Sequence, residues 1–155
     1  MTTDPLANQR YFEDVAAGDE FEEFQQPTAE NVAAYIKASA NSTVRDGRFT
    51  DADRARALGL DRPIVPGPMS ASMLTRLVTD WMGPLGRITS LDVSFRRPVQ
   101  HEDKLRCVAL VTDVNGDGDF EGTGAGAVHL DVTLENERGE KPVQGTAIVE
   151  LPRRA

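Results

Sequence analysis

The stretch Pro63-Ile64-Val65-Pro66-Gly67-Pro68, together with residues 69–82 behind it, decides the fold. Glycine reaches backbone angles that other residues avoid, and proline suits the first turn of a helix. Gly67-Pro68 therefore predicts the start of a helix, and Gly83-Pro84 predicts its end. Its apolar residues recur at helical spacing and are Met69, Met73, Leu74, Leu77, Val78, Trp81 and Met82. This is the widest apolar face in the chain, so we expect a core helix around which strands wrap.

The composition is that of a folded, acidic chain. It has 155 residues, 39% hydrophobic and 27% charged, so we expect one globular domain over residues 1–155, with a loose segment at residues 1–10. The formal net charge of −8 argues against nucleic acid as a partner, because phosphates require a basic surface. No apolar run reaches the ~20 residues of a membrane span, and no signal peptide is evident, which predicts a cytoplasmic protein. The single cysteine, Cys107, excludes an internal disulfide.

Two shorter helices and five strands are predicted around the core helix. Thr28 and Asp51 are suitable N-caps for the two short helices. Alternating or strongly apolar runs predict strands, which cover residues 20–26, 88–95, 105–114, 127–134 and 143–151. Phe21 and Phe24 are the expected aromatic anchors of the first strand. A helix-rich half followed by an antiparallel meander indicates an α+β fold, with the sheet curled around the long helix.

Other motifs that carry chemistry are incomplete. Asp113-x-Asn115-x-Asp117-Gly118 copies half of a calcium loop, but the twelfth position is Gly124 instead of a glutamate, so we expect no metal site. Cys107 lies within a strand and is expected to be a small buried hydrophobe. His101, in a turn, and His129, in a strand, are interpreted as structural or surface histidines.

Three segments, in order along nearly the whole chain, resemble the MaoC-like family of (R)-specific enoyl-CoA hydratases and dehydratases. The first spans residues 11–19 and contains Tyr11, Phe12, Gly18 and Asp19. The second spans residues 51–67 and contains Asp51, Ala55, Gly59, Pro63, Ile64 and Gly67. The third spans residues 93–105 and contains Val93, Phe95, Arg96, Arg97, Pro98, Asp103 and Leu105.

The resemblance implies a hot-dog fold, a dimer whose sheets join, and a tunnel for a coenzyme A thioester, with no further cofactor. In the family, an aspartate and a histidine on the loop after the first helix hold the water that adds to an enoyl-CoA. The backbone N–H of the glycine that begins the core helix polarises the thioester carbonyl. That role suits Gly67, because an N–H at a helix N-terminus stabilises developing negative charge.

The chain departs from the family at the residues that move protons. Asp51 matches the last position of the family's loop motif, which places Phe49 at the histidine and Asn41 at the first aspartate. Pro66 stands where a histidine often precedes the glycine. Phenylalanine has no proton to transfer and an amide does not titrate usefully, so the acid–base pair is absent. Asp46 is a weak candidate for the vacant role, since it has no imidazole partner.

The binding half of the site is retained. The resemblance implies a carbonyl contact at Gly67, with Pro66 and Ile64 beside it. Three arginines are candidates to meet the phosphates of coenzyme A, with solvated ion pairs as the alternative, and they are Arg62, Arg96 and Arg97.

Three functions fit this combination. The first is a non-catalytic subunit that binds acyl-CoA and shapes the acyl tunnel beside a partner with the acid–base pair. The second is an active hydratase that uses Asp46 or groups from a second subunit. The third is a thioester-binding hot-dog module without a hydratase partner, such as a thioesterase relative or a regulator. Exposed apolar helix and sheet edge predict an oligomer of like or unlike chains.

Overall fold

The structure is a computed structural model in which residues 3–39, 47–116 and 124–155 are described. Asn41 and Asp46 therefore lie outside the described residues. In chain order the elements are η1 (Phe12–Asp14), β1 (Glu20–Gln25), α1 (Ala29–Ser39), η3 (Gly47–Phe49), α2 (Ala52–Ala57), α3 (Gly67–Met82), β2 (Arg87–Phe95), β3 (Leu105–Asn115), β4 (Gly126–Glu135) and β5 (Val143–Leu151), where η marks a short 3₁₀ helix.

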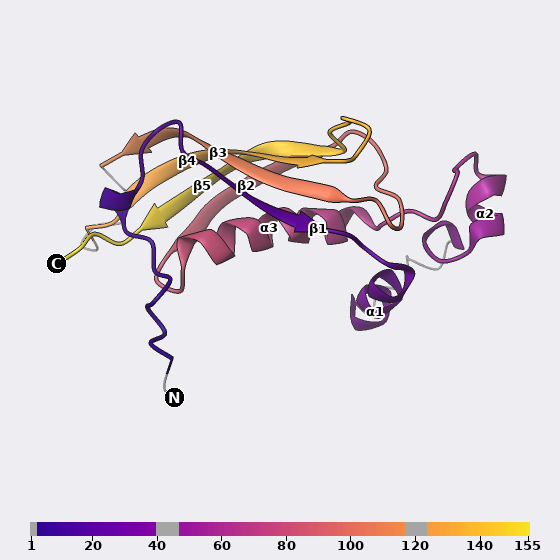
Figure 1. Cartoon of the computed structure of the whole chain (residues 1–155), viewed down its shortest axis with the longest axis horizontal. Helices are drawn as coiled ribbons and strands as arrows, with labels where there is room; N and C mark the ends of the chain where they lie inside the picture. Colours follow the sequence, from indigo (N-terminus) through magenta and orange to yellow (C-terminus); the bar gives the residue numbers. More distant parts are fainter. Residues whose placement is uncertain (1–2, 40–46, 117–123) are drawn as a thin grey trace.

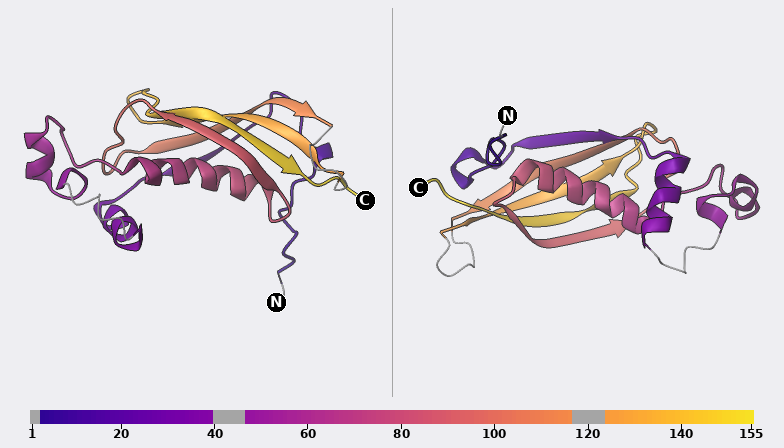
Figure 2. Two further views of the ribbon diagram at one scale, coloured as in Figure 1. Left: turned by 180° about the vertical axis from the view of Figure 1, so that it is seen from behind. Right: turned by 90° about the horizontal axis from the view of Figure 1, so that it is seen from below.

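The strands form one antiparallel sheet in the order β1-β3-β4-β5-β2, and α3 lies across one face of it (Figure 1). Viewed from the helix side, α3 crosses the sheet, while α1 and α2 lie beyond the end at which α3 begins (Figure 2). The expected α+β arrangement, a long helix against an antiparallel sheet, is confirmed. The chain that follows α2 therefore leads directly to the N-terminus of α3.

Local signals in the sequence explain where the helices begin. The Thr28 hydroxyl accepts a hydrogen bond from the Asn31 N–H at 3.1 Å, as an N-cap does. The Asp51 carboxylate accepts from the Asp53 and Arg54 N–H groups at 2.9 and 3.3 Å. At the far end of α3, Gly83 has φ +78°, a left-handed conformation that ends a helix at little steric cost.

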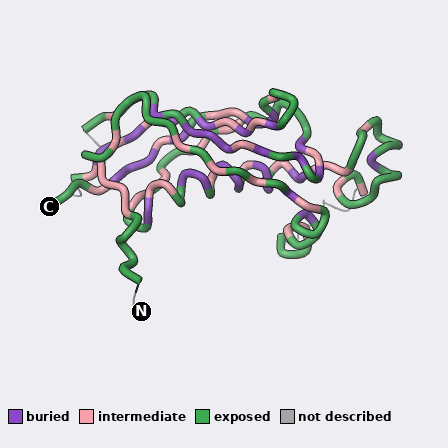
Figure 3. Tube along the Cα trace, viewed as in Figure 1, coloured by how far each residue is buried: buried purple, intermediate pink, exposed green. Residues whose placement is uncertain are grey.

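The core lies between α3 and the sheet. On β4, alternate residues Val128, Leu130, Val132 and Leu134 are buried, as period-two alternation requires. On α3, the buried apolar residues are Met69, Met73, Leu74, Leu77 and Val78. Buried segments run along α3 and the strands, whereas α2 and the N-terminal segment are largely exposed (Figure 3). The helix that carries Gly67 is thus held against the sheet by this core.

Close backbone contact between β5 and β2 places the end of β2 beside α3. A Cβ atom at Gly145 would lie 2.0 Å from the Asp92 carbonyl oxygen and 2.7 Å from the Val93 Cα, so only glycine fits. The register pairs Phe95 with Val143 at the end of β2. The Phe95 ring consequently lies over the start of α3, with its Cε1 3.3 Å from where a Gly67 Cβ would be.

The expectation that Phe21 and Phe24 both anchor β1 is wrong for Phe24. Its side chain is 70% exposed, whereas Phe21 stacks on Trp81 of α3 with ring centroids 4.4 Å apart. Residues three apart on a strand face opposite sides of the sheet, so the two rings cannot share the core.

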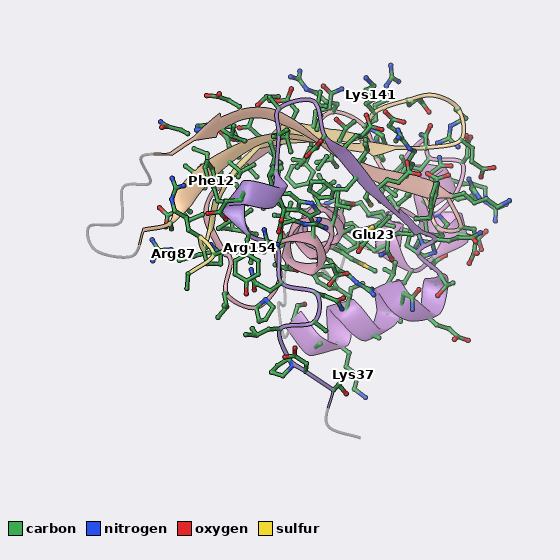
Figure 4. All side chains as sticks on the ribbon, turned by 60° about the vertical axis from the view of Figure 1, so that its left-hand side comes forward. Phe12, Glu23, Lys37, Arg87, Lys141 and Arg154 are labelled. Atoms are coloured by element: carbon green, nitrogen blue, oxygen red, sulfur yellow. The ribbon has the colours of Figure 1, made fainter. Side chains whose placement is uncertain are left out.

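A carboxyl pair also lies where β1 passes α3. The Glu23 side chain, labelled in Figure 4, comes from β1, and Asp80 of α3 is beside it. Burial and this neighbouring carboxyl raise the pKa of Glu23.

Gln9, in the N-terminal segment, binds the end of α3. Its side chain donates to the Met82 carbonyl at 2.9 Å and accepts from the Leu85 N–H at 2.7 Å.

Among the described residues, none of the helices combines the length and the apolar character that a membrane crossing requires.

Candidate functional site

A cavity of about 400 Å³ opens at the N-terminus of α3, and we call it the Gly67 cavity. Its walls come from η3, the segment leading into α3, the end of β2 with the residues after it, and the start of β5. They are Arg48, Phe49, Ile64, Val65, Gly67, Ser70, Phe95, Arg96, Arg97, Pro98, Val99 and Val143. The fold therefore brings Phe49, Ile64, Gly67, Arg96 and Arg97, all singled out from the sequence, to one cavity.

The Gly67 N–H is a hydrogen-bond donor without an acceptor among the described residues. It belongs to the first turn of α3, in which Met69 N–H and Ser70 N–H donate to the Pro66 carbonyl at 3.0 and 3.1 Å. Pro68 has no N–H, so Gly67 provides the first free donor of the helix. A helix N-terminus carries partial positive charge, and this donor can therefore stabilise a carbonyl oxygen that gains negative charge.

Phe49 supplies an apolar wall at the position where the family resemblance places a histidine. The half-buried ring ends η3, and the chain around it is fixed by two backbone bonds. Asp51 N–H donates to the Gly47 carbonyl at 2.7 Å, and Ile64 N–H donates to the Arg48 carbonyl at 3.0 Å. No titratable carboxyl or imidazole group is among the described residues that line this cavity.

Arginines are the charged residues of the Gly67 cavity within the described part of the chain. Arg48, Arg96 and Arg97 line it, in a protein whose formal charge is −8. Arg97 forms an ion pair with Glu140 at 3.3 Å. The other arginine expected from the sequence, Arg62, lines a neighbouring cavity and pairs with the buried Asp103 at 3.1 Å. An anionic group at this mouth would meet several guanidinium groups.

His101 lies directly behind the cavity wall, a position that the sequence did not indicate. His101 is only 6% exposed, and its ring Nε2 is buried without a hydrogen-bond partner among the described residues. Its backbone N–H donates to the Pro63 carbonyl at 3.0 Å. Burial lowers the pKa of His101, while the backbone of Phe49, the charge of Glu102 and the backbone of Ile64 act in the opposite direction. The interpretation as a structural histidine agrees with this burial.

We expect His101 to make stability depend on pH. Below its ordinary pKa of 6.5 the unfolded chain takes up a proton that the folded protein resists, so the free energy of unfolding should fall as pH decreases. One proton contributes at most about 1.4 kcal/mol per pH unit. The free energy of unfolding, measured by urea denaturation at several values between about pH 5 and pH 8, should depend less steeply on pH in His101→Gln than in the wild type. His129→Gln is the matched control, and equal flattening in both variants would contradict this assignment.

Two other residues weighed from the sequence lie in the sheet. Cys107 is fully buried in β3, and burial raises the pKa of its thiol to about 12, so it is an inert core residue as expected. His129 lies half-buried on β4. Within residues 3–39, 47–116 and 124–155, no group of three or more histidine, cysteine, aspartate or glutamate side chains is placed to hold a metal ion.

Solved structures with the same architecture are numerous. The (R)-hydratase from A. caviae involved in PHA biosynthesis is 23% identical, with a TM-score of 0.78 over 90% of this chain and 99% of that one. The R-hydratase PhaJ1 from Pseudomonas aeruginosa is 19% identical, with a TM-score of 0.77 over 93% of this chain and 86% of that one. A chain of the ChsH1–ChsH2 complex from Mycobacterium tuberculosis is 23% identical, with a TM-score of 0.73 over 88% of this chain and 98% of that one. At these identities the likeness establishes the hot-dog fold.

The sequence itself gives the family. No curated protein sequence matches the chain. Residues 49–136, more than half of the chain, match the family model described as a MaoC like domain. This span includes α3 and the wall residues of the Gly67 cavity from Phe49 to Val99. The chain therefore belongs to the MaoC-like domain family.

Proposed function

We propose that this protein binds acyl-CoA thioesters in the Gly67 cavity and does not itself hydrate them. The observation that carries the proposal is that Gly67, whose N–H has no acceptor among the described residues, lines the same cavity as Phe49, the residue at which the family resemblance places a histidine. In this proposal the thioester carbonyl accepts a hydrogen bond from Gly67, and the acyl and pantetheine parts lie along the apolar walls.

The chemistry of hydration supports the division between binding and catalysis. Adding water to an enoyl thioester requires a base that takes a proton from the water and an acid that protonates the α-carbon. Stabilising the enolate oxygen requires only a fixed donor, which a backbone N–H supplies. The described lining of the Gly67 cavity has such a donor and has no acid–base group.

The proposal includes a different chain with the same fold, one that carries the acid–base pair this chain lacks. Within the described residues, β2 pairs only with β5, so its other edge has unpaired backbone groups. Phe95 is 54% exposed at the end of this edge and lines the Gly67 cavity. A partner added at the β2 edge would cover Phe95 and extend the cavity wall.

The test of the proposed function is a pair of measurements on the purified chain alone. Titration with butyryl-CoA, a saturated thioester, should give saturable binding, and crotonyl-CoA should undergo no hydration above the uncatalysed rate. Brisk hydration of crotonyl-CoA would contradict the non-catalytic role. Absence of binding by any acyl-CoA would contradict the thioester site itself.

Substitutions at Gly67 test the backbone donor directly. Gly67→Pro removes the N–H at a helix position that tolerates proline, whereas Gly67→Ala keeps it. Both place a Cβ 3.3 Å from Phe95 Cε1, so the alanine variant controls for this contact. We expect Gly67→Pro to weaken butyryl-CoA binding about tenfold more than Gly67→Ala does, as for loss of one hydrogen bond to a polarised carbonyl. Isothermal titration calorimetry measures both, and equal losses would mean that the N–H makes no contact.

A further inference from the structure

Glu23 is a carboxylic acid on the face of β1 that packs against α3. Strand alternation puts Phe21, Glu23 and Gln25 on this inner face, and all three are half-buried. In the register with β3, Glu23 is directly opposite the fully buried Cys107, so the two side chains lie on the same face of the sheet. A charged carboxylate at such a position is costly unless a partner satisfies it.

The partner of Glu23 is a second acidic group. Asp80 of α3 lies within hydrogen-bonding reach of the Glu23 carboxyl group. Glu23 Oε2 is buried, and no donor group among the described residues gives it a hydrogen bond. Two carboxylates cannot hydrogen-bond to each other because both only accept, whereas a protonated carboxyl group donates to a carboxylate. The pair is therefore satisfied only while it holds one proton.

The other groups that face Glu23 do not replace this proton. The main contacts of β1 are with β3 and α3. From β3, Cys107 faces Glu23, and burial raises the pKa of its thiol to about 12, so it stays neutral. From α3, Arg76 pairs with Asp80 at 3.5 Å, but the two side chains are 66% and 52% exposed, so solvent screens their charges. Burial and the Asp80 carboxyl raise the pKa of Glu23, and the charge of Arg76 opposes them.

The strand is attached to the sheet independently of this pair. It pairs with β3 along its whole length, and on the outer face Arg106 forms ion pairs with Glu20, at 2.8 Å, and with Glu22. Toward α3, the next part of the seam after Glu23 is a cavity of about 290 Å³ with Gln25 and Arg76 in its wall. Its inner face is therefore not closely packed there, and β1 can move away from α3 while it stays paired with β3.

We propose that Glu23 and Asp80 form a pH-dependent contact between β1 and α3. With one shared proton, the two carboxyl groups hydrogen-bond and hold the strand against the helix. When the proton is lost, two negative charges face each other at short range, and β1 moves away from α3. The stack of Phe21 on Trp81, which lies beside the pair, separates with the strand. This contact requires no ligand, so it is independent of the proposed function.

The raised pKa of Glu23 determines the sign of the pH dependence. Below 4.5, its ordinary pKa, Glu23 is protonated in the folded and the unfolded chain, and the contact contributes fully to stability. That contribution is lost as the pH rises through the folded-state pKa. Glu23→Gln keeps the shape and a donor but cannot ionise, so it should match the wild type at about pH 4 and be more stable at about pH 8. The gain in the folding equilibrium constant is about tenfold for each unit by which the pKa is raised.

Trp81 reports on this contact because it is the single tryptophan of the chain. Its ring centroid is 4.4 Å from that of Phe21 on β1, and the Arg10 guanidinium lies over the ring at 5.6 Å. Acrylamide is an uncharged quencher, so a change of charge at Asp80 does not alter its access. Quenching of Trp81 fluorescence should increase in the wild type as pH rises from 4.5 to about 8, and stay constant in Glu23→Gln.

Two further variants complete the test on the full chain. Asp80→Asn should also remove the pH dependence, because its amide donates to a charged Glu23, and the double variant with Glu23→Gln should add nothing further. Glu20→Gln is the matched control, since Glu20 lies on the same strand but pairs with Arg106 on the outer face, so quenching should remain pH-dependent.

Three results would overturn the inference. The first is wild-type quenching that does not change with pH. The second is quenching in Glu23→Gln that follows the wild type at every pH. The third is loss of the pH dependence in Glu20→Gln as complete as in Glu23→Gln, since the effect would then come from β1 carboxylates in general.

Discussion

Gly145→Ala is expected to lower the free energy of unfolding by more than about 3 kcal/mol, a value in the range of severe overpacking. The added Cβ would lie 2.0 Å from the Asp92 carbonyl oxygen and 2.7 Å from the Val93 Cα. Both neighbours are backbone atoms of β2, so no side-chain rotation relieves the contact. The strand must move away, which breaks its register with β5 and shifts Phe95 from the start of α3. Urea denaturation of the purified variant measures the loss.

Gly116→Ala is the control for this substitution. Among the described residues, a Cβ at Gly116 meets only the end of the flexible Arg153 side chain, with Nη2 at 3.1 Å, which can move aside. We expect this variant to change the free energy of unfolding by less than about 1 kcal/mol. A Gly145→Ala variant as stable as Gly116→Ala would show that β2 and β5 do not approach as closely as described. Because Phe95 lines the Gly67 cavity, Gly145→Ala should also weaken the thioester binding that we propose there.

Leu74→Ala is expected to cost about 2–5 kcal/mol of stability, as large-to-small changes in well-packed cores do. Leu74 is fully buried near the middle of α3, the helix that contacts all the strands of the sheet. Removing three side-chain carbons loses their transfer free energy and leaves a void that rigid neighbours fill only in part. The measurement is again urea denaturation, with the slope of the transition compared between variant and wild type.

Thr79→Ala on the same helix is the matched control. Thr79 is exposed, and its hydroxyl donates to the Arg76 carbonyl at 3.1 Å. We expect a change within about 0.5 kcal/mol, which is normal for surface positions. If Leu74→Ala were no more costly than Thr79→Ala, the core would not depend on α3 in the way its burial indicates.

Local patterns predicted the elements, because local physics determines them. The apolar spacing of residues 69–82 and the Gly67-Pro68 start predicted α3, and the N-caps at Thr28 and Asp51 predicted where α1 and α2 begin. Alternation predicted β4 within one residue at each end. Phe24 was wrongly placed because aromatic content was given more weight than strand periodicity. Each of these signals requires only residues a few positions apart.

Contacts between distant residues could not be predicted in the same way. Asp103 and Arg138 are separated by 35 positions, and their ion pair depends on how the β4–β5 turn lies against the segment before β3. The burial of His101 depends on the position of the segment around Phe49 and Pro63. Hydrophobic pattern carries no signal for either. The family resemblance pointed to Gly67, Arg62, Arg96 and Arg97, all of which line the two neighbouring cavities. Only the folded arrangement shows that Ser70, Phe95 and Arg138 line them as well.

The donor at the start of α3 has a consequence for how such a protein changes over time. It belongs to the main chain, so every amino acid except proline supplies it. A single substitution can remove an imidazole or a carboxylate, but only a substitution to proline removes this backbone N–H. Proteins with this architecture should therefore lose catalytic activity through random substitution more readily than they lose the donor for a carbonyl. Inactive relatives that still bind a ligand are the expected result.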